Sequence, residues 1–151
     1  MDNWDGEMLD LGQCTKADTN FDKMLSLGGY HFSVDTAAYQ SLTTEFNYNW
    51  ASQACLGTHP RLQFTGLGAI KKSLTGEIYP FYRGGFDQVQ LMALEAEQGL
   101  PLKLITATGL NLDFWCITHI QEESTEFMLG GLPKKMTFQL ELLYYGQQGV
   151  M

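Results

Sequence analysis

A ten-residue alternation between positions 41 and 50 constrains the fold more than any other feature of this chain. Large or β-branched side chains occupy every second position, and mostly small or polar side chains lie between them. The set on one face is Leu42, Thr44, Phe46, Tyr48 and Trp50. Successive side chains of a strand point to opposite faces of its sheet, so this spacing predicts a half-buried antiparallel strand with one wet face.

Similar alternation predicts further short strands along the chain. They cover residues 30–34, 62–64, 70–74, 102–107, 112–121 and 135–145. Gly66, Gly68 and Gly76 predict breaks between the strands of the first half. Residues 109–111 predict a tight hairpin, and the acidic and glycine-rich stretch 122–133 predicts a long hairpin loop.

Residues 86–98 change to helical spacing. The main apolar stripe consists of Phe86, Val89, Met92, Ala93 and Ala96. Gly99 follows as a C-terminal stop. Leu91 and Leu94 lie off the stripe, so the helix has two apolar faces. Either the helix is buried deeply in its own fold, or Leu91 and Leu94 contact another subunit.

The strand predicted at residues 112–121 is apolar on both faces. We expect one face to carry Leu112, Phe114, Cys116 and Ile120, and the other to carry Trp115 and Ile117. Such a strand is central or is covered by a partner, which makes Trp115 and Ile117 candidate interface residues. Strands, one helix and more strands predict an α+β fold, an antiparallel β-sandwich or barrel with one flanking α-helix.

The first 23 residues have a different composition from the rest. They contain six acids and two lysines, which account for −4 of the net charge of −8. No clear period is present, so we expect an acidic N-terminal arm at 1–23 before a β domain at 24–151. Trp4 and Leu9 are candidate anchors of this arm on a neighbouring subunit.

Charge and hydropathy exclude several classes of partner. Phosphate binding requires clustered cations, and the chain has 9 lysines and arginines against 17 acids, so we expect no specific nucleic-acid binding. No run approaches the ~20 apolar residues of a membrane span, so we expect no membrane insertion. We also expect no signal peptide, and therefore assembly in the cytoplasm.

No group of residues has the spacing of a catalytic, metal or cofactor site. Cys14, Cys55 and Cys116 form no CxxC pair, and the histidines are isolated from one another. Residues 18–22 resemble the start of a calcium loop, but its sixth and twelfth positions hold Lys23 and Gly29. We therefore expect no enzyme activity, no metal and no cofactor.

Several motifs in a fixed order resemble the GpU family of tail proteins from contractile-tailed phages. They are Phe32-Ser33-Val34-Asp35-Thr36, Tyr39-Gln40-Ser41-Leu42, Trp50-Ala51-Ser52-Gln53, Gly57, Pro60-Arg61-Leu62-Gln63-Phe64-Thr65-Gly66, Gly76 with Tyr79-Pro80, and Gly84-Gly85. The resemblance covers about residues 25–145. It implies that the β-sandwich or barrel is of tail-tube type, and that the chain is a structural, non-catalytic virion tail protein or part of a phage-tail-like bacteriocin. The implied assembly is a hexameric ring of identical subunits that links the tail tube to the baseplate hub.

The resemblance also implies the partners: further copies of the chain, the tail tube protein, the baseplate hub protein and the tape measure protein. A terminator ring at the head-proximal end of the tube is an alternative. A different alternative is a small-ligand-binding β-barrel, whose pocket would be lined by Tyr48, Trp50, Trp115 and Tyr144. An enzyme is the third class, although no set of residues supports it.

Overall fold

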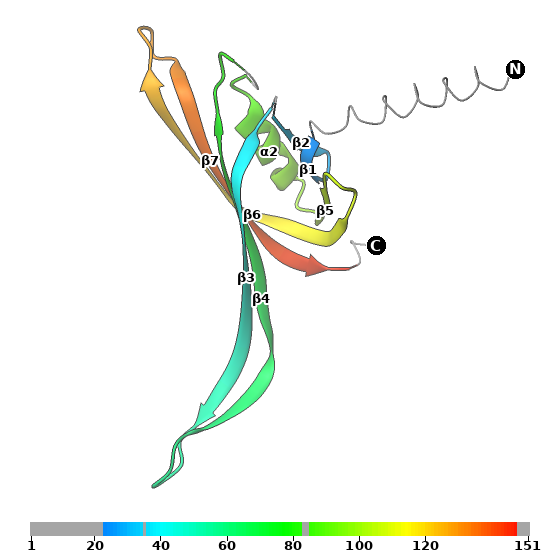
Figure 1. Cartoon of the computed structure of the whole chain (residues 1–151), viewed down its shortest axis with the longest axis vertical. Helices are drawn as coiled ribbons and strands as arrows, with labels where there is room; N and C mark the ends of the chain where they lie inside the picture. Colours follow the sequence, from blue (N-terminus) through cyan, green and yellow to red (C-terminus); the bar gives the residue numbers. More distant parts are fainter. Residues whose placement is uncertain (1–22, 35, 83–84, 148–151) are drawn as a thin grey trace, which may run out of the picture.

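The computed structural model describes residues 23–34, 36–82 and 85–147 (Figure 1). In chain order the elements are β1 (Lys23–Leu27), β2 (Tyr30–Ser33), β3 (Ala38–Gln53), β4 (Arg61–Ile78), α2 (Gln88–Glu97), β5 (Leu102–Thr106), β6 (Asn111–Phe127) and β7 (Pro133–Gly146). The strands form one seven-stranded sheet in the order β2-β1-β5-β6-β7-β4-β3. All of its neighbouring strands are antiparallel.

The sheet bends until its two edges meet across the core. Phe32 on edge strand β2 stacks on Phe138 of β7, with ring centroids 6.2 Å apart. It also packs edge-on against Tyr39 of the opposite edge strand β3, at 6.5 Å. β2 and β3 are not hydrogen-bonded neighbours, so the sheet is open and sandwich-like rather than a closed barrel. The predicted α+β class with one flanking helix is confirmed.

Helix α2 covers one side of this core (Figure 1). It buries Val89 and Met92, which belong to the hydrophobic core of the domain. At its first turn, the hydroxyl of Tyr30 donates a 2.6 Å hydrogen bond to Oε1 of Gln88. Burial raises the pKa of Tyr30 to about 12, because a phenolate in this position would lose its hydration. The helix ends before Gly99, whose φ of +66° suits glycine.

The predicted breaks in the first half of the chain are wrong. β4 runs unbroken from Arg61 to Ile78 through Gly66, Gly68 and Gly76. Register shifts near the first two glycines show that β-bulges take up the irregularity. Gly76 instead lies in close contact with the ring of Phe138 on β7. A glycine within a strand thus marks a bulge or a close approach as readily as a break.

The predicted acidic loop is also wrong. β6 continues to Phe127, and Glu122, Glu123 and Thr125 pair with residues of β7. The connection is the short segment between Phe127 and Pro133, where the backbone N–H of Met128 donates to the carbonyl of Leu132 at 2.8 Å. Polar residues fill a strand here because this part of β6 extends beyond the core.

The predicted faces of β6 differ from the observed ones. A register shift lies between Ile117 and His119. As a result, Trp115, Ile117 and Ile120 all lie opposite the inward-facing residues of β7. Strict alternation would separate Ile120 from the other two, so the bulge changes the face.

Candidate assembly surface

The hairpin of β3 and β4 extends far beyond the rest of the sheet (Figure 1). β7 pairs with β4 only between Lys71 and Ile78. Residues 46–70, which we call the hairpin arm, therefore form a two-stranded ribbon with no third strand beside them. Isolated two-stranded ribbons are only marginally stable in water, so this length of unsupported hairpin needs a structural or functional reason.

One face of the hairpin arm is apolar. The register places Tyr48 opposite Leu67, Trp50 opposite Phe64, and Ser52 opposite Leu62. Directly opposed residues share a face of the sheet, so these side chains form one surface together with Phe46. We call it the arm face; its members are Phe46, Tyr48, Trp50, Leu62, Phe64 and Leu67.

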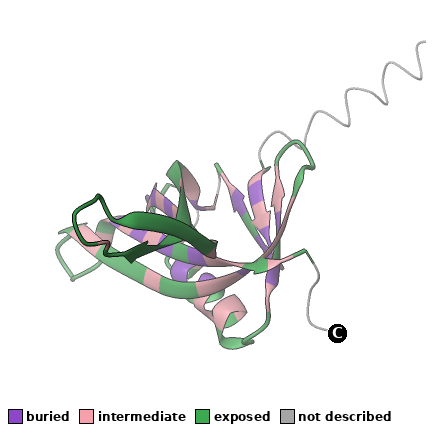
Figure 2. Cartoon of the chain, turned by 90° about the horizontal axis from the view of Figure 1, so that it is seen from below, coloured by how far each residue is buried: buried purple, intermediate pink, exposed green. Residues whose placement is uncertain are grey.

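The arm face is exposed. Phe46, Tyr48 and Trp50 are each 58% accessible, and Leu67 is 75% accessible. Figure 2 shows the buried residues confined to the body and the outer parts of the long strands exposed. The alternation at residues 41–50 therefore predicts the strand correctly but its burial wrongly. No other part of the described chain covers its apolar side.

The arm face continues from the buried face of the sheet. Leu74 lies opposite both Leu42 and Leu140, and Lys72 lies opposite Thr44 and Leu142 on the same side. Leu74, Leu140 and Leu142 are buried. One apolar surface thus begins in the core and extends onto the hairpin arm, where helix and neighbouring strands no longer cover it.

Lys72 marks the point where the hairpin arm leaves the body. Its ammonium donates a 2.8 Å hydrogen bond to Oγ1 of Thr44 and lies 5.2 Å from the centre of the Trp115 ring. Burial lowers its pKa, because the charged form loses hydration. Nearby, the hydroxyl of Tyr144 donates to Oδ2 of Asp113 at 3.2 Å. These groups border a shallow hollow of about 300 Å³ at the base of the arm.

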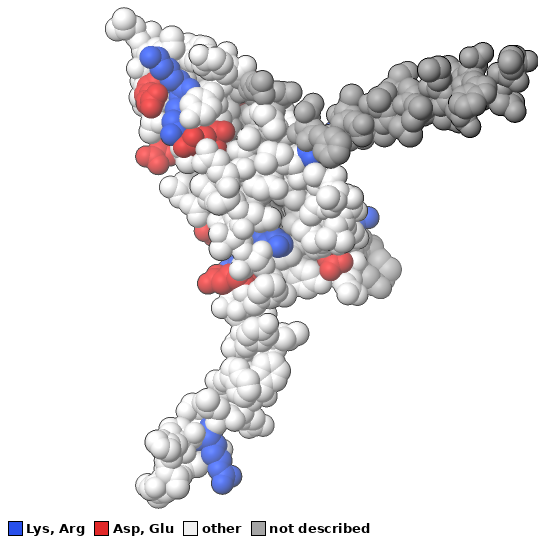
Figure 3. Space-filling view, viewed as in Figure 1, with Lys and Arg blue, Asp and Glu red and all other residues white. Residues whose placement is uncertain are grey.

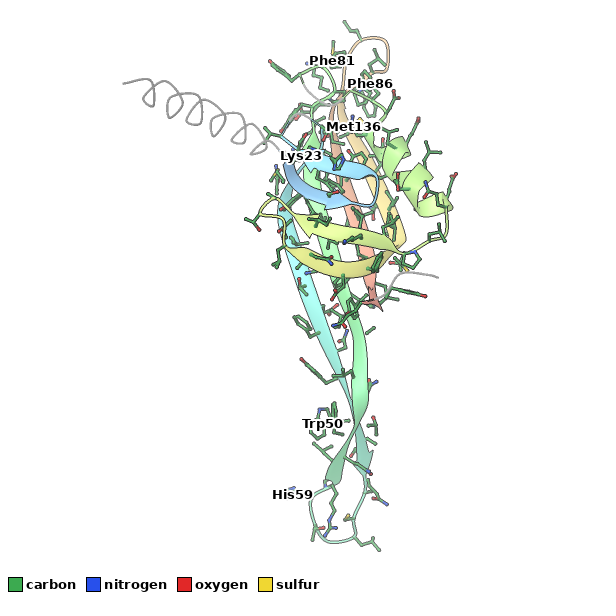
Figure 4. The ribbon with its side chains drawn as sticks, turned by 90° about the vertical axis from the view of Figure 1, so that its right-hand side faces the viewer. Lys23, Trp50, His59, Phe81, Phe86 and Met136 are labelled. Atoms are coloured by element: carbon green, nitrogen blue, oxygen red, sulfur yellow. The ribbon has the colours of Figure 1, made fainter. Side chains whose placement is uncertain are left out.

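A second group of exposed apolar side chains lies at the opposite end of the molecule. Phe81 and Phe86 pack edge to face with centroids 5.4 Å apart, and both are at the end far from Trp50 (Figure 4). We call this group, which includes the β6–β7 loop, the end cluster. Its members are Tyr79, Phe81, Tyr82, Phe86, Phe127, Met128, Leu129 and Leu132.

A polar cluster connects the strands beneath the end cluster. Glu77 of β4 forms a 2.6 Å ion pair with Lys135 of β7. It also accepts hydrogen bonds from Tyr79 and from Gln40 of β3, both at 3.0 Å. The bonds from Lys135 and Tyr79 lower the pKa of Glu77, and the same carboxylate raises the pKa values of Lys135 and Tyr79. One carboxylate thus bridges β3, β4 and β7.

The predicted interface residues fall into three groups. Leu91 and Leu94 are 44% and 57% exposed on the outer side of α2. Trp115 is buried in the core at 4% exposure, and Ile117 packs partly against the core, so neither offers a free apolar surface. Trp4 and Leu9 lie outside the described residues. Sequence pattern alone does not mark the arm face as an interface, although Tyr48 and Trp50 belong to the alternation at residues 41–50.

The four aromatic residues predicted for a ligand pocket are not together. Tyr48 and Trp50 lie on the hairpin arm, whereas Trp115 and Tyr144 pack against each other in the body, with centroids 5.2 Å apart. None of the four best-formed hollows of the described residues is lined by all four aromatic side chains. The ligand-binding barrel is therefore not supported, since its pocket would need them side by side.

Within residues 23–34, 36–82 and 85–147, no three His, Cys, Asp or Glu side chains are grouped closely enough to hold a metal ion. Over the same ranges, no helix has the length and apolar character needed to cross a membrane.

One solved structure shares this architecture. A solved structure described as SPP1 Dit (gp 19.1), a paradigm of the hub adsorption apparatus in phages infecting Gram-positive bacteria, has a TM-score of 0.61 at 7% identity. The match covers 83% of this chain and 51% of that protein, so the chain spans about half of its length. A tail protein of an empty GTA particle, solved with C6 symmetry, has a TM-score of 0.49 at 12% identity, covering 86% and 95% of the two chains.

The family comparison identifies the chain more directly. No curated protein matches it in sequence. The family model described as Phage P2 GpU matches residues 28–147, which is most of the chain and includes every element from β2 to β7. The chain belongs to the Phage P2 GpU family and is a structural protein of the virion tail.

Proposed function

We propose that the protein assembles into a ring of identical subunits that joins the tail tube to the baseplate hub of a contractile tail. The observation that carries the proposal is the arm face: six large apolar side chains on a two-stranded ribbon that no other described residues cover. Contiguous exposed apolar surface of this kind marks a protein–protein interface.

The open edge of the sheet supports self-association. β3 is an edge strand of 16 residues, and its only charged residue is Glu45. Proteins that avoid edge-to-edge pairing protect such strands with lysine, proline or short length, and β3 has none of these. An unprotected edge is what a subunit needs if its neighbour is to add to the sheet or pack beside it.

The two ends of the molecule support contacts beyond the ring. The hairpin arm and the end cluster lie at opposite ends of the long axis, and both expose aromatic side chains (Figure 4). A subunit between two different neighbours requires two such surfaces. We propose the tail tube protein and the baseplate hub protein as these neighbours, with the tape measure protein passing through the ring. The hub role described for SPP1 Dit, which shares the fold, agrees with this placement.

The number of subunits follows from the family resemblance, which implies six. An interface between two different patches of the same chain closes into a ring when the rotation between subunits divides the circle. The arm face and the remaining surface of the body are different patches, which favours a ring over a two-fold dimer. The role is structural, with no catalytic step and no specific nucleic-acid contact.

Light scattering coupled to size-exclusion chromatography tests the proposal. The full chain is measured alone and after mixing with the cognate tube and hub proteins. We expect a six-fold mass for the ring and co-elution with at least one of the two proteins. A chain that remains monomeric at every concentration and joins neither partner would rule the proposal out. A density map of the tail then distinguishes the baseplate end of the tube from the head-proximal end.

A further inference from the structure

Strand β4 contains two bulges inside the hairpin arm. At the first bulge, Asn47 of β3 lies opposite two residues of β4, Gly68 and Ala69. At the second, Thr65 of β4 is not paired with any residue of β3. Each bulge moves the pairing of the two strands by one residue. The tip of the arm is therefore two residues out of step with its base.

A side-chain hydrogen bond spans each bulge. Nδ2 of Asn47 donates to the backbone carbonyl of Ala69 at 3.0 Å. The hydroxyl of Thr65 donates to the backbone carbonyl of Asn49 at 3.1 Å. A bulge interrupts the regular ladder of backbone hydrogen bonds, and these two side chains bond to backbone carbonyls at the interruptions. Each bond therefore stabilises the bulge beside it.

Two glycines fit the same bulges. Gly66 follows Thr65 and has a φ of +142°, which residues with a side chain rarely adopt. A methyl group on Gly68 would lie 2.7 Å from the backbone carbonyl oxygen of Asn47. A side chain at either position would therefore oppose the observed pairing.

The bulges decide which residues form the arm face. In the observed register, Leu67 lies opposite Tyr48. In a regular register without bulges, the pairing at the base of the arm would continue in step, and Leu67 would lie opposite Asn49 on the other face. Gly66 and Gly68 would take its place on the arm face. Leu67 is 75% accessible, the most exposed of the six members, so the arm face would lose its centre.

Few other features select between the two registers. None of the other described strands flanks the arm, so packing in the core does not fix its pairing. Arg61 is the only charged residue among positions 46–70, and the visible face of the arm in Figure 3 is uncharged over most of its length. Two shifts of one residue also return the tip to its original face, so Leu62 and Phe64 lie on the arm face in either register. The contact of Phe64 with Trp50 and the bonds at the bulges remain to distinguish them.

We propose that Asn47 and Thr65 are positioning residues that fix the register of the hairpin arm and thereby place Leu67 on the arm face. Neither residue belongs to the arm face itself. The consequence for assembly rests on the proposed function, whereas the register is a property of the single chain. Loss of the two bonds favours the regular register, in which a partner would meet two glycines in place of Leu67.

Disulfide formation within one chain measures the register. The native thiols are first removed by Cys14→Ser, Cys55→Ser and Cys116→Ala. Gln63→Cys with Ala51→Cys reports the observed register, in which these two positions face each other. Gln63→Cys with Gln53→Cys reports the regular register, in which position 53 would take the place of position 51. All three positions lie on the side opposite to the arm face, so neither pair of cysteines alters that face.

The two disulfides are counted by mass spectrometry after mild oxidation. Trypsin cleaves after Arg61, so either disulfide holds two peptides together. With Asn47 and Thr65 in place, we expect the disulfide between positions 51 and 63 to form much faster than the one between 53 and 63.

Removing the two hydrogen bonds should change this preference. Asn47→Ala with Thr65→Val should lower the ratio of the first rate to the second by about tenfold or more, because each bond contributes to the observed register. Thr65→Ser retains the hydroxyl and should retain the ratio. Thr43→Val, in a part of β3 without a register shift, is the matched control. An unchanged ratio in the double variant would overturn the proposal. Loss of both disulfides would also overturn it, because the two side chains would then hold the strands together without selecting a register.

Assembly provides the second readout. Thr65→Val should raise the concentration at which half of the chains are assembled, and Thr65→Ser should not. If the register changes but assembly is equally strong, the link between Leu67 and assembly is ruled out. If the unchanged chain forms no ring under any condition, the proposed function fails, while the disulfide ratio still decides whether Asn47 and Thr65 set the register.

Discussion

Trp50 and Phe64 face each other across the hairpin arm with ring centroids 5.1 Å apart, although 58% and 47% of their respective surfaces are accessible. Paired aromatic rings in this arrangement stabilise the ribbon, yet they leave most of the arm face open. The pair therefore makes this part of the arm face a preorganised apolar surface for association. Rigid aromatic anchors lose little conformational entropy on binding, which favours a tight interface.

Replacing Trp50 by alanine should weaken assembly without unfolding the chain. Trp50 lies on the arm, outside the core, so the midpoint of urea unfolding of the body should change little. Association should weaken about 30-fold or more, because interface tryptophans commonly contribute about 2 kcal/mol or more. Sedimentation at several concentrations measures this. Asn49→Ala, on the opposite face of the same strand, is the matched control; equal effects of the two variants would contradict the role of the arm face.

Deleting residues 1–22 should leave a folded domain. The buried core of the described structure extends from Leu25 to Leu142, and β1 begins at Lys23. The truncated chain should unfold cooperatively near the midpoint of the full chain, while its binding to tube or hub protein weakens. Circular dichroism and pull-down with these proteins give the two readouts. A truncated chain that does not fold would show that the segment is part of the domain.

Gly76→Ala should destabilise the fold strongly. A methyl group at this position would lie 2.7 Å from two ring atoms of Phe138 and would also meet the carbonyl oxygen of Ala38. Neither the buried ring nor the backbone can move freely, so we expect a loss of about 2 kcal/mol or more in the free energy of unfolding. Urea denaturation measures it. Thr75→Ala, which faces the other side of β4, should change the same quantity by much less.

Tyr30 should make stability fall at alkaline pH. Its pKa is raised to about 12 in the fold, above the ordinary value of 10.0. Folding therefore favours the neutral phenol. The resulting contribution to the stability of the fold is complete below pH 10 and is lost as the pH rises toward 12. Tyr30→Phe should remove this part of the pH dependence. It should also lower stability at pH 7 by about 1 kcal/mol, because the hydrogen bond to Gln88 is lost. If Tyr30→Phe lost as much stability as the unchanged chain between pH 10 and pH 12, groups other than Tyr30 would be responsible for the loss.

Glu77 should make stability fall in acid. Its pKa is lowered from 4.5, first by the hydrogen bond from Lys135 and then by that from Tyr79. A carboxylate whose pKa is lowered by folding stabilises the fold at pH values above its pKa in the unfolded chain. This contribution is lost as the pH falls through its pKa in the folded chain. Glu77→Gln should flatten the decline in thermal midpoint below pH 4.5. Glu123→Gln, on an exposed part of β6, is the control and should retain the decline.

Local pattern was sufficient for the strands and the helix that follow a regular period. The alternation at 41–50 lies within β3, the helical spacing at 86–98 contains α2, and the strand predicted at 135–145 is β7. Pattern failed where a glycine or a charge was open to two interpretations. Gly66 and Gly68 accompany bulges inside β4, and the acidic run 122–126 is the end of β6. A bulge depends on the partner strand, which sequence spacing does not specify.

The sequence by itself determined the α+β class with one flanking helix, because periodicity acts over short distances, and its ordered motifs indicated the family. Only the tertiary structure decided which apolar face is covered. β7 supports β4 no further than Lys71, so Phe46, Tyr48 and Trp50 have the spacing of core residues but lie outside the core. Burial depends on the neighbours that a strand acquires, and none of the described strands flanks this hairpin beyond that point.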